Sequence, residues 1–364
     1  GFGLLGVTCL LIPLLLAGAA CAPAFAQSSV TLFGVVDVNV GWIKNDESSW
    51  QLGTNGMATG RLGFRGIEDL GGGLRAGFWL EGEINPDTGT STASYGNGDA
   101  VIGGFNFRRR STVSLFNPWG EIRLGRDNTP THWNWAVFDP FGTTGVGNAQ
   151  NIAIDRQLTQ GTGGVYGTLV RANNMASYVL PGGTAGSGLV GQLSVAAGED
   201  APGNKYAGGR IGYSAGPYNV AAAYAETWLT ADNSVKAKVW NIGGWWDFGV
   251  VRVSGIYNQI DISGGGFPGS QQDNWFIGAT APLDLWRFNI SWGDARGGGT
   301  ISSNNATQFA ISANYELSVR TALYAIYSTI NNSGNAGYRV TNASSPLTPG
   351  HNSQGVQIGV RHIF

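Results

Sequence analysis

The chain has 364 residues, of which only 12% are charged, and it carries 59 glycines, 11% aromatic residues and a net charge of -2. A soluble domain averages about 25% charged residues, whereas a disordered chain lacks such aromatic content. A helical membrane protein would show several apolar runs of about 20 residues, and a nucleic-acid binder a basic surface. The composition therefore excludes these classes, and the length allows one large domain or two ordinary ones.

The one long apolar run lies at the N-terminus, at residues 2–26, and ends in Ala-Phe-Ala before Gln27. An apolar core followed by an A-x-A site is typical of a secretory signal peptide. We therefore expect residues 1–26 to be a signal peptide, with its basic start missing from the sequence, and residues 27–364 to be one β-barrel domain. Both cysteines, Cys9 and Cys21, fall in the leader, so a thiol nucleophile or a cysteine metal site is not expected in the rest of the chain.

Alternation of apolar and polar residues with period two dominates from residue 30 onward. In the first segment Val36, Val38 and Val40 share one face, and Asp37 and Asn39 share the other, as on the two faces of a strand. Similar segments recur along the chain, and no helical period of useful length appears. We predict sixteen strands, at 30–44, 59–69, 74–85, 106–115, 120–128, 166–179, 188–198, 206–215, 218–228, 235–248, 250–262, 271–281, 285–294, 306–315, 320–331 and 353–364.

The connections between these strands alternate between short and long. Short turns at one end and long Gly-, Asn- and Ser-rich loops at the other are typical of an outer-membrane barrel. In lipid every backbone N–H and C=O must be paired internally, so the sheet has to close. The predicted fold is all-β: a sixteen-stranded antiparallel transmembrane β-barrel with short periplasmic turns, long external loops and glycines at turns and wall bends. A secreted adhesin or soluble β-sandwich is the rival, although its strands are usually shorter.

Several motifs, in their order along the chain, resemble the Gram-negative trimeric porins. They are QSSVTLFGVVD (27–37), GRLGFRGIEDLGGGL (60–74), GEIRLGRD (120–127), FDPFG (138–142), RANNMASY (171–178) and the terminal Phe364. The resemblance spans residues 27–364. It implies a water-filled channel in the cell outer membrane, assembled as a homotrimer, that passes small hydrophilic solutes and inorganic ions by diffusion.

The resemblance also implies where such a channel is narrowest. In the family the third external loop, here about 129–165, folds into the lumen, and its acidic residues face basic residues on the wall. Rings of charge of this kind set ion selectivity. On the wall the matching residues are Arg61, Arg65, Arg75 and Arg126, and on the loop the acidic candidates are Asp139 and Asp155.

Alternation in the strands agrees with an inward direction for Arg61, Arg65 and Arg75. It places Arg126 outward, whereas the resemblance implies that Arg126 faces the lumen, and we follow the resemblance because a β-bulge beside Gly125 would reset the face. The predicted loop carries only two acids, so the constriction is expected to be net positive. The sequence therefore predicts an anion preference.

Two other functions are compatible with parts of the sequence. A channel that prefers organic anions or sugars is the first alternative, because Trp133 and Trp135 could form a sugar-stacking track, although packing of the loop is the preferred explanation for them. An outer-membrane barrel enzyme is the second, but His132, His351 and His362 lie in no known catalytic motif. No cofactor, metal site or nucleic-acid partner is expected, and outer-membrane lipid is the expected surrounding.

Overall fold

The computed structural model describes residues 29–92, 104–154, 158, 167–199, 205–341 and 345–364. The predicted signal peptide lies outside the described residues. Among the residues described, no helix is long and apolar enough to cross a membrane. The strands are β1 (Ser29–Lys44), β2 (Ser48–Thr54), β3 (Arg61–Gly71), β4 (Leu74–Glu83), β5 (Arg110–Asn117), β6 (Gly120–Asn128), β7 (Arg171–Val179), β8 (Gly188–Ala196), β9 (Tyr206–Ala215), β10 (Tyr218–Trp228), β11 (Val235–Asp247), β12 (Arg252–Gly264), β13 (Phe267–Leu283), β14 (Trp286–Gly299), β15 (Asn305–Glu316), β16 (Thr321–Ser333) and β17 (Ser353–Ile363).

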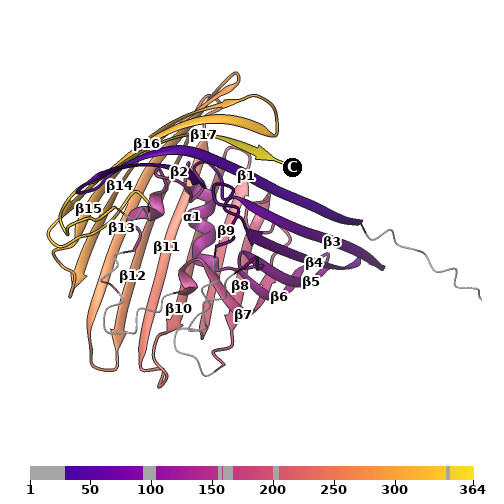
Figure 1. The fold of residues 1–364 in the computed structure, drawn as a ribbon. Helices are drawn as coiled ribbons and strands as arrows, with labels where there is room; N and C mark the ends of the chain where they lie inside the picture. The colour runs from indigo at the N-terminus through magenta and orange to yellow at the C-terminus, as the bar shows by residue number, and fades with distance from the viewer. Residues whose placement is uncertain (1–28, 93–103, 155–157, 159–166, 200–204, 342–344) are drawn as a thin grey trace, which may run out of the picture.

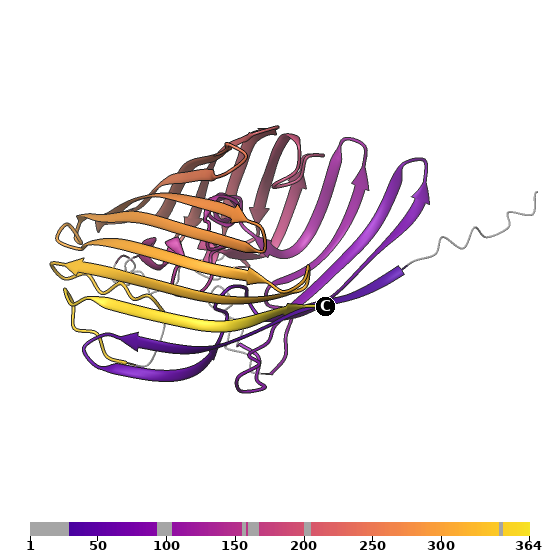
Figure 2. The same cartoon turned by 90° about the horizontal axis from the view of Figure 1, so that it is seen from above.

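The strands form one closed antiparallel barrel, which curves around a central segment in Figure 2. Apart from β2 and β3, consecutive strands pair with each other, and β17 returns to pair with β1 from Val35–Ile363 to Lys44–Gln354. The strands β2 and β3 both pair with β1. The strand β2 pairs with residues 38–44 of β1, and β3 pairs with residues 29–35. They therefore occupy a single place in the wall, so the seventeen strands make the sixteen wall positions that the sequence predicts.

Alternation along the strands separates a lipid-facing surface from the lumen. On β1 the side chains of Leu32 and Val40 are 53% and 51% exposed, whereas those of Asp37 and Asn39 are 0% and 1% exposed. Exposed aromatic side chains lie at two levels of the wall: near the short turns, at Trp246, Phe248, Trp286 and Phe288, and near the middle of the long strands, at Tyr224, Trp240, Trp275 and Trp292. An apolar band bordered by aromatic girdles is the outer surface that a bilayer requires.

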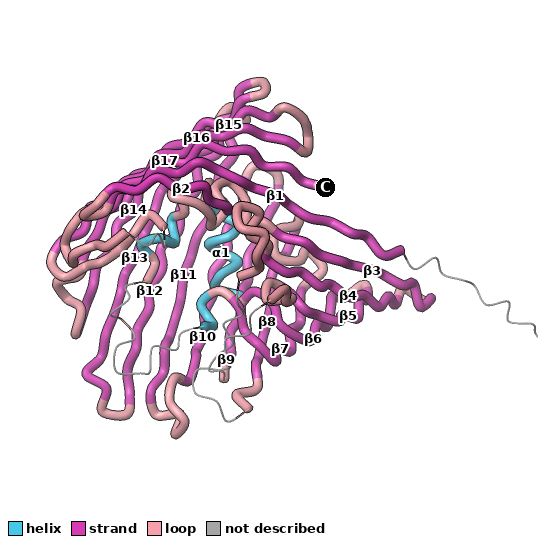
Figure 3. Tube along the Cα trace, viewed as in Figure 1, coloured by secondary structure: helices cyan, strands magenta, loops and turns pink. Residues whose placement is uncertain are grey.

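A helical segment lies inside the barrel, as Figures 1 and 3 show, and we call its residues 130–154 the lumenal segment. The helix α1 (Pro130–Phe138) begins with proline at its first turn, and the short 3-10 helices η1 (Ala149–Ile152) and η2 (Gly167–Leu169) follow it. A proline at this position has the backbone angle of a helix and lacks only an N–H that would be unpaired there. The sequence shows no helical period of useful length, and α1 does not change this, because its nine residues are too few to establish one.

Inward-facing glycines give this segment room to lie close to the wall. A Cβ atom on Gly243 would lie 2.6 Å from the Phe138 ring, and one on Gly278 would lie 2.5 Å from Pro140. The corresponding distances are 3.1 Å from Gly293 to Ile152 and 2.8 Å from Gly355 to Val146. We call Gly243, Gly278, Gly293 and Gly355 the glycine row. These glycines serve a close approach of two chain segments and not only the turns and bends that the sequence analysis proposed.

Neutral amide side chains on the same wall hold the segment by hydrogen bonds. Asn241 donates to the carbonyl of Thr131 at 3.0 Å, and Gln272 and Asn274 donate to the carbonyl of Ile152 at 2.8 and 2.6 Å. Gln357 accepts the N–H of Val146 at 2.9 Å. Because these amides satisfy buried backbone groups of a loop, they fix its path across the lumen without adding charge.

Candidate functional site

A lumenal cavity of about 780 Å³ lies between the wall of β3 to β7 and the segment that carries α1. Five arginines line it from the wall, and we call them the arginine side: Arg61, Arg108, Arg109, Arg110 and Arg171. Three carboxylates line it as well, at Glu81, Glu83 and Asp127. From the loop it is lined by His132, Trp133, Ala136, Gly142, Thr143, Asn148 and Gln150.

The lengths of the strands explain why the arginines meet at one level. Arg61, Arg110 and Arg171 are the first residues of β3, β5 and β7, which have 11, 8 and 9 residues. The strands opposite are longer, with 17 residues in β13 and 14 in β14. The short strands thus end below the rim of the barrel, beside the point where the loop after β6 enters the lumen.

Carboxylates from neighbouring strands pair with part of the arginine side. Arg109 Nε lies 2.5 Å from Glu81 Oε1, Arg108 lies 3.6 Å from Glu83, and Arg110 lies 3.8 Å from Asp127. Arg110 also lies over the Trp79 ring, 4.7 Å from its centroid. These pairs hold the guanidinium groups in place and reduce, but do not cancel, the positive charge of the cavity.

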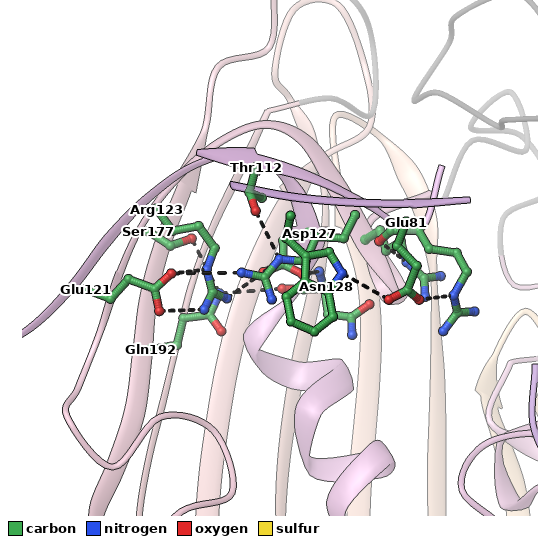
Figure 4. A network of polar contacts seen from close by, with 12 residues as sticks. Glu81, Thr112, Glu121, Arg123, Asp127, Asn128, Ser177 and Gln192 are labelled. Atoms are coloured by element: carbon green, nitrogen blue, oxygen red, sulfur yellow. Dashed lines mark hydrogen bonds and ion pairs between the residues drawn. The ribbon is translucent and has the colours of Figure 1, made fainter. Parts of the chain in front are cut away.

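A polar network on β6, joined to the arginine side through the pairing of Arg110 with Asp127 and Glu121, holds Arg123 (Figure 4). Arg123 bonds Glu121 through Nε at 2.7 Å and Asp127 through Nη1 at 2.5 Å. Its side chain is therefore enclosed between two carboxylates and does not line the cavity. Arg123 neutralises acidic groups that would otherwise offset the arginine side.

Two more guanidinium groups bind the backbone of the arginine side. Arg171 Nε donates to the carbonyl of Arg109 at 2.8 Å, and Arg126 Nε donates to the carbonyl of Arg108 at 2.5 Å. These bonds fix the three consecutive arginines 108–110 directly before and at the start of β5. They also explain how charges of one sign are held together, because each backbone carbonyl offers them a partial negative charge.

Arg61 differs from its neighbours in its contacts. It lines the cavity, and among the residues that the structure describes no carboxylate lies within ion-pair distance of it. Arg109 and Glu81 are the charged groups that act on it electrostatically. Its donors are therefore directed to the lumen rather than to a fixed partner.

His132 contributes no charge to the cavity at neutral pH. It lies on α1, is only 5% exposed, and accepts or donates one hydrogen bond with Gln150 at 3.3 Å. Burial, together with the positive charges of Arg171 and Arg109, lowers the pKa of His132 to about 3. An imidazolium in this position would be both desolvated and repelled.

The acidic residue Asp139 lies on the lumenal segment but points into it. Its carboxylate accepts the N–H groups of Phe141, Thr143 and Ala149 at 3.0, 3.1 and 3.0 Å. Burial raises the pKa of Asp139 to about 6, although the three N–H groups act in the opposite direction. Asp155, the other acidic candidate, lies outside the described residues.

The predicted wall arginines are spread along the barrel. Arg61 and Arg65 share one face of β3, as alternation predicts, but Arg65 packs over Phe33 and Trp79, with 5.5 and 5.2 Å to the ring centroids. Arg75 lies near the short turn, 5.5 Å from the Phe116 ring. The structure thus brings only Arg61 of the predicted set into the cavity.

Arg126 lies at the shift in register that the sequence analysis proposed, between Gly125 and Asp127. On the other side of β6 it pairs with Ser111, next to the pair of Gly125 and Thr112. Its side chain bonds the carbonyl of Arg108 and the amide of Asn173 and does not line the cavity. Arg126 therefore lies behind the arginine side.

The sequence places Arg108 and Arg110 among the arginines of the wall, but it gives no indication that Arg109 and Arg171 line the cavity. Alternation cannot place three consecutive arginines on one side, and Arg109 precedes β5, where backbone direction is no longer that of a strand. The run of three arginines was itself the available signal. Of the two loop tryptophans, Trp133 lines the cavity, whereas Trp135 is buried and stacks on Phe276 at 5.9 Å.

Comparison with known proteins gives one consistent family. The family described as Gram-negative porin matches residues 14–335. Outer membrane porin protein 32 of Delftia acidovorans is 35% identical, over 95% of this chain and 97% of that protein. An outer-membrane porin of Bordetella pertussis is 28% identical, over 98% and 99%.

Solved structures of outer-membrane proteins are also similar to this chain. The anion-selective porin from Comamonas acidovorans superimposes with a TM-score of 0.80 at 34% identity, covering 93% of this chain and 100% of that one. The outer-membrane protein OmpT of Vibrio cholerae gives a TM-score of 0.65 at 13% identity, covering 93% and 98%. The second likeness concerns the fold alone.

Proposed function

The chain belongs to the Gram-negative porin family and is an outer-membrane channel for passive diffusion, and we propose that its lumen prefers anions through the arginine side. The observation that carries this proposal is the composition of the cavity lining, with five arginines against three carboxylates. No charged side chain from the described part of the lumenal segment lines the cavity at neutral pH. A low-dielectric wall around such a site strengthens its field.

Two further points support the proposal. A relative with 34% identity is itself described as an anion-selective porin. Arg61 has no fixed carboxylate partner among the described residues, so it can bind a passing anion directly. In the same proposal Arg65 and Arg75 on the wall and Arg126 behind Arg108 add to the field at longer range, and Asp139 and Asp155 reduce it when ionised.

The reversal potential in a planar bilayer under a KCl gradient tests the preference. It is best measured near 0.1 M salt, where the Debye length is about 10 Å and the wall charges still act across the lumen. We expect a sign that corresponds to chloride permeating faster than potassium. Clear cation selectivity would overturn the proposal.

The solutes are proposed to be small hydrophilic molecules and inorganic ions. Liposome swelling with sugars and organic anions of graded size separates a general diffusion channel from one that prefers organic anions or sugars. A general channel gives rates that fall smoothly with solute size. A preferring channel gives one class that enters faster than its size allows.

The assembly is proposed to be a homotrimer, and residues 1–26 a signal peptide that directs export through the periplasm. Native mass spectrometry of the protein in detergent tests the first point, with three chains expected. N-terminal sequencing of the purified protein tests the second and is expected to begin at Gln27. We also propose that the channel has no enzymatic activity, which a zymogram for lipase and protease tests.

A further inference from the structure

Residues 55–60 leave the barrel wall between β2 and β3. On β1, Val38 pairs with Thr54 and Val35 pairs with Arg61. The two β1 residues between these pairs, Val36 and Asp37, thus face a gap that the six residues 55–60 bridge. We call residues 55–60 the inserted segment.

The inserted segment lies in the lumen and not outside the barrel. Asn55, Met57, Ala58 and Thr59 line the same cavity as the arginine side. Thr59 Oγ1 lies 3.4 Å from Thr144 Oγ1 on the lumenal loop, and Thr144 donates to the carbonyl of Asn55 at 3.5 Å. The segment therefore connects the arginine side to the loop that faces it.

One buried carboxylate fixes the inserted segment. Asp37, which is 0% exposed, accepts the consecutive N–H groups of Gly56, Met57 and Ala58 at 3.1, 2.9 and 2.8 Å. Three successive N–H groups that point at one anion form a concave nest. The hydroxyl of Tyr324, on β16, donates to the same carboxylate. The carboxylate of Asp37 is therefore held by hydrogen-bond donors from the inserted segment and from β16, which is separated from β1 by β17.

The residue identities within the segment fit this arrangement. A Cβ on Gly56 would lie 2.2 Å from the Tyr324 hydroxyl, so only glycine allows the close approach. Asn55 has a positive φ of 62° and accepts the N–H of Gly60 at 2.7 Å, which closes the segment on itself. Arg61 follows directly, so the end of the segment fixes where β3 and its first side chain begin.

We propose that the inserted segment is a second constriction element, and that Asp37 and Tyr324 are positioning residues that hold it and Arg61 in the lumen. The inference rests on the proposed anion preference. It assigns to Asp37 a role opposite to that of an ordinary lumenal carboxylate. A free carboxylate would weaken the anion preference, whereas Asp37, enclosed by four donors, maintains it by holding Arg61.

This difference in sign makes the test decisive. If Asp37 acted only by its charge, Asp37→Ala would increase the anion preference. Our proposal predicts that Asp37→Ala lowers the anion-to-cation permeability ratio and raises single-channel conductance, each by about twofold, because the site of closest charge contact is lost. Glu316→Gln is the matched control, since Glu316 is a carboxylate bonded to Arg287 and Arg361 away from the cavity.

A milder variant and a rescue cover the case in which Asp37→Ala does not fold. Tyr324→Phe removes one donor and keeps the ring, and we expect a smaller change in the same direction. The sequence from residue 27 onward has no cysteine, so a Thr59→Cys, Thr144→Cys pair can be cross-linked selectively. Oxidation of this pair in the Tyr324→Phe background is expected to restore the wild-type conductance and reversal potential.

The proposal is overturned if Asp37→Ala, or Tyr324→Phe where only that variant folds, leaves conductance unchanged. It is equally overturned if the anion preference rises in that variant, if Glu316→Gln changes the conductance to the same extent, or if the cysteine pair restores nothing. A wild-type channel without anion preference would instead refute the proposed function. In that case the conductance of the same variants still decides whether the segment narrows the lumen.

Discussion

Arg171 donates from Nε to the backbone carbonyl of Arg109 at 2.8 Å, while the side chain of Arg109 is paired with Glu81 at 2.5 Å. The backbone of one arginine thus positions the side chain of another. Through this relationship β5 and β7 bring their charges to one level of the lumen, although β6 lies between them in the wall.

Arg61 should contribute more to selectivity than Arg65, which is 4 residues further along β3. We expect Arg61→Gln to reduce the anion-to-cation permeability ratio severalfold, since a unit charge acting at about 4 Å in water is worth ~1 kcal/mol. The matched Arg65→Gln variant should change it little, because Arg65 packs on Phe33 and Trp79 and does not itself line the cavity. Reversal potentials of both variants check this, and an equal loss would contradict it.

His132 should not titrate in the physiological range. Its pKa is lowered to about 3, so it stays neutral between about pH 5 and pH 8. We expect the reversal potential of His132→Gln to follow the wild-type pH profile throughout this interval. The exposed His351 supplies the comparison, through His351→Gln. A step near pH 6 that vanishes only in His132→Gln would show the prediction to be wrong.

Asp139 should make the folded channel more stable in acid. Burial raises its pKa from 3.8 to about 6, so the folded protein binds a proton more tightly than the unfolded chain does. The stabilisation is fully present below about pH 4 and is lost as pH rises through about 6, amounting to ~3 kcal/mol over the interval. Denaturant unfolding at a series of pH values measures it.

The variant Asp139→Asn should lack this part of the pH dependence. Asp232→Asn is the control, because Asp232 is exposed in an external turn and its pKa is lowered to about 2, below the interval. If wild type and Asp139→Asn keep the same slope between pH 4 and pH 6, the assignment to Asp139 fails.

The glycine row should control how far the lumenal segment stands from the wall. In Gly278→Ala the new methyl group would lie 2.5 Å from Pro140, so the segment must shift toward the cavity or the barrel must strain. Overpacking of this kind costs about 1–3 kcal/mol. We expect lower single-channel conductance and a lower unfolding midpoint.

Gly41→Ala is the matched control for this prediction. Gly41 also lies on the inward face of its strand, but the nearest atoms to an added Cβ are 3.5 Å away, an ordinary contact. Its conductance should equal that of the wild type. A decrease of the same size in both variants would show that the glycine row has no special effect on the lumen.

Strands and loops followed from the sequence because alternation persists wherever one face meets lipid. Alternation predicts a strand at 235–248, and in the structure this strand is β11, at Val235–Asp247. It missed β2, whose residues Ser48–Thr54 are largely polar and read as a loop. Only pairing with residues 38–44 of β1 makes this segment a strand, and a local pattern does not contain that information.

The cavity was harder to predict than the wall for a related reason. Alternation predicts which face of a strand a side chain lies on, but not its position along the barrel axis. Arg61, Arg65 and Arg75 are therefore equivalent in the sequence pattern, and only the strand lengths distinguish them. Alternation also does not predict the burial of Asp139, because the three N–H groups that enclose it come from a fold of the loop on itself. Resemblance identified the loop, and geometry decided which of its groups reach the lumen.

The largely neutral anchoring of the lumenal segment has a consequence for engineering. Glycines and neutral amides on β11 to β17 position this segment, together with Arg210 on β9, which donates to Asn134 at 2.6 Å, whereas the arginine side lies between β3 and β7. Outside the inserted segment, the width of the lumen and its charge therefore depend on different residues. Substitutions on the arginine side could therefore change the charge of the lumen, and substitutions in the glycine row could change its width.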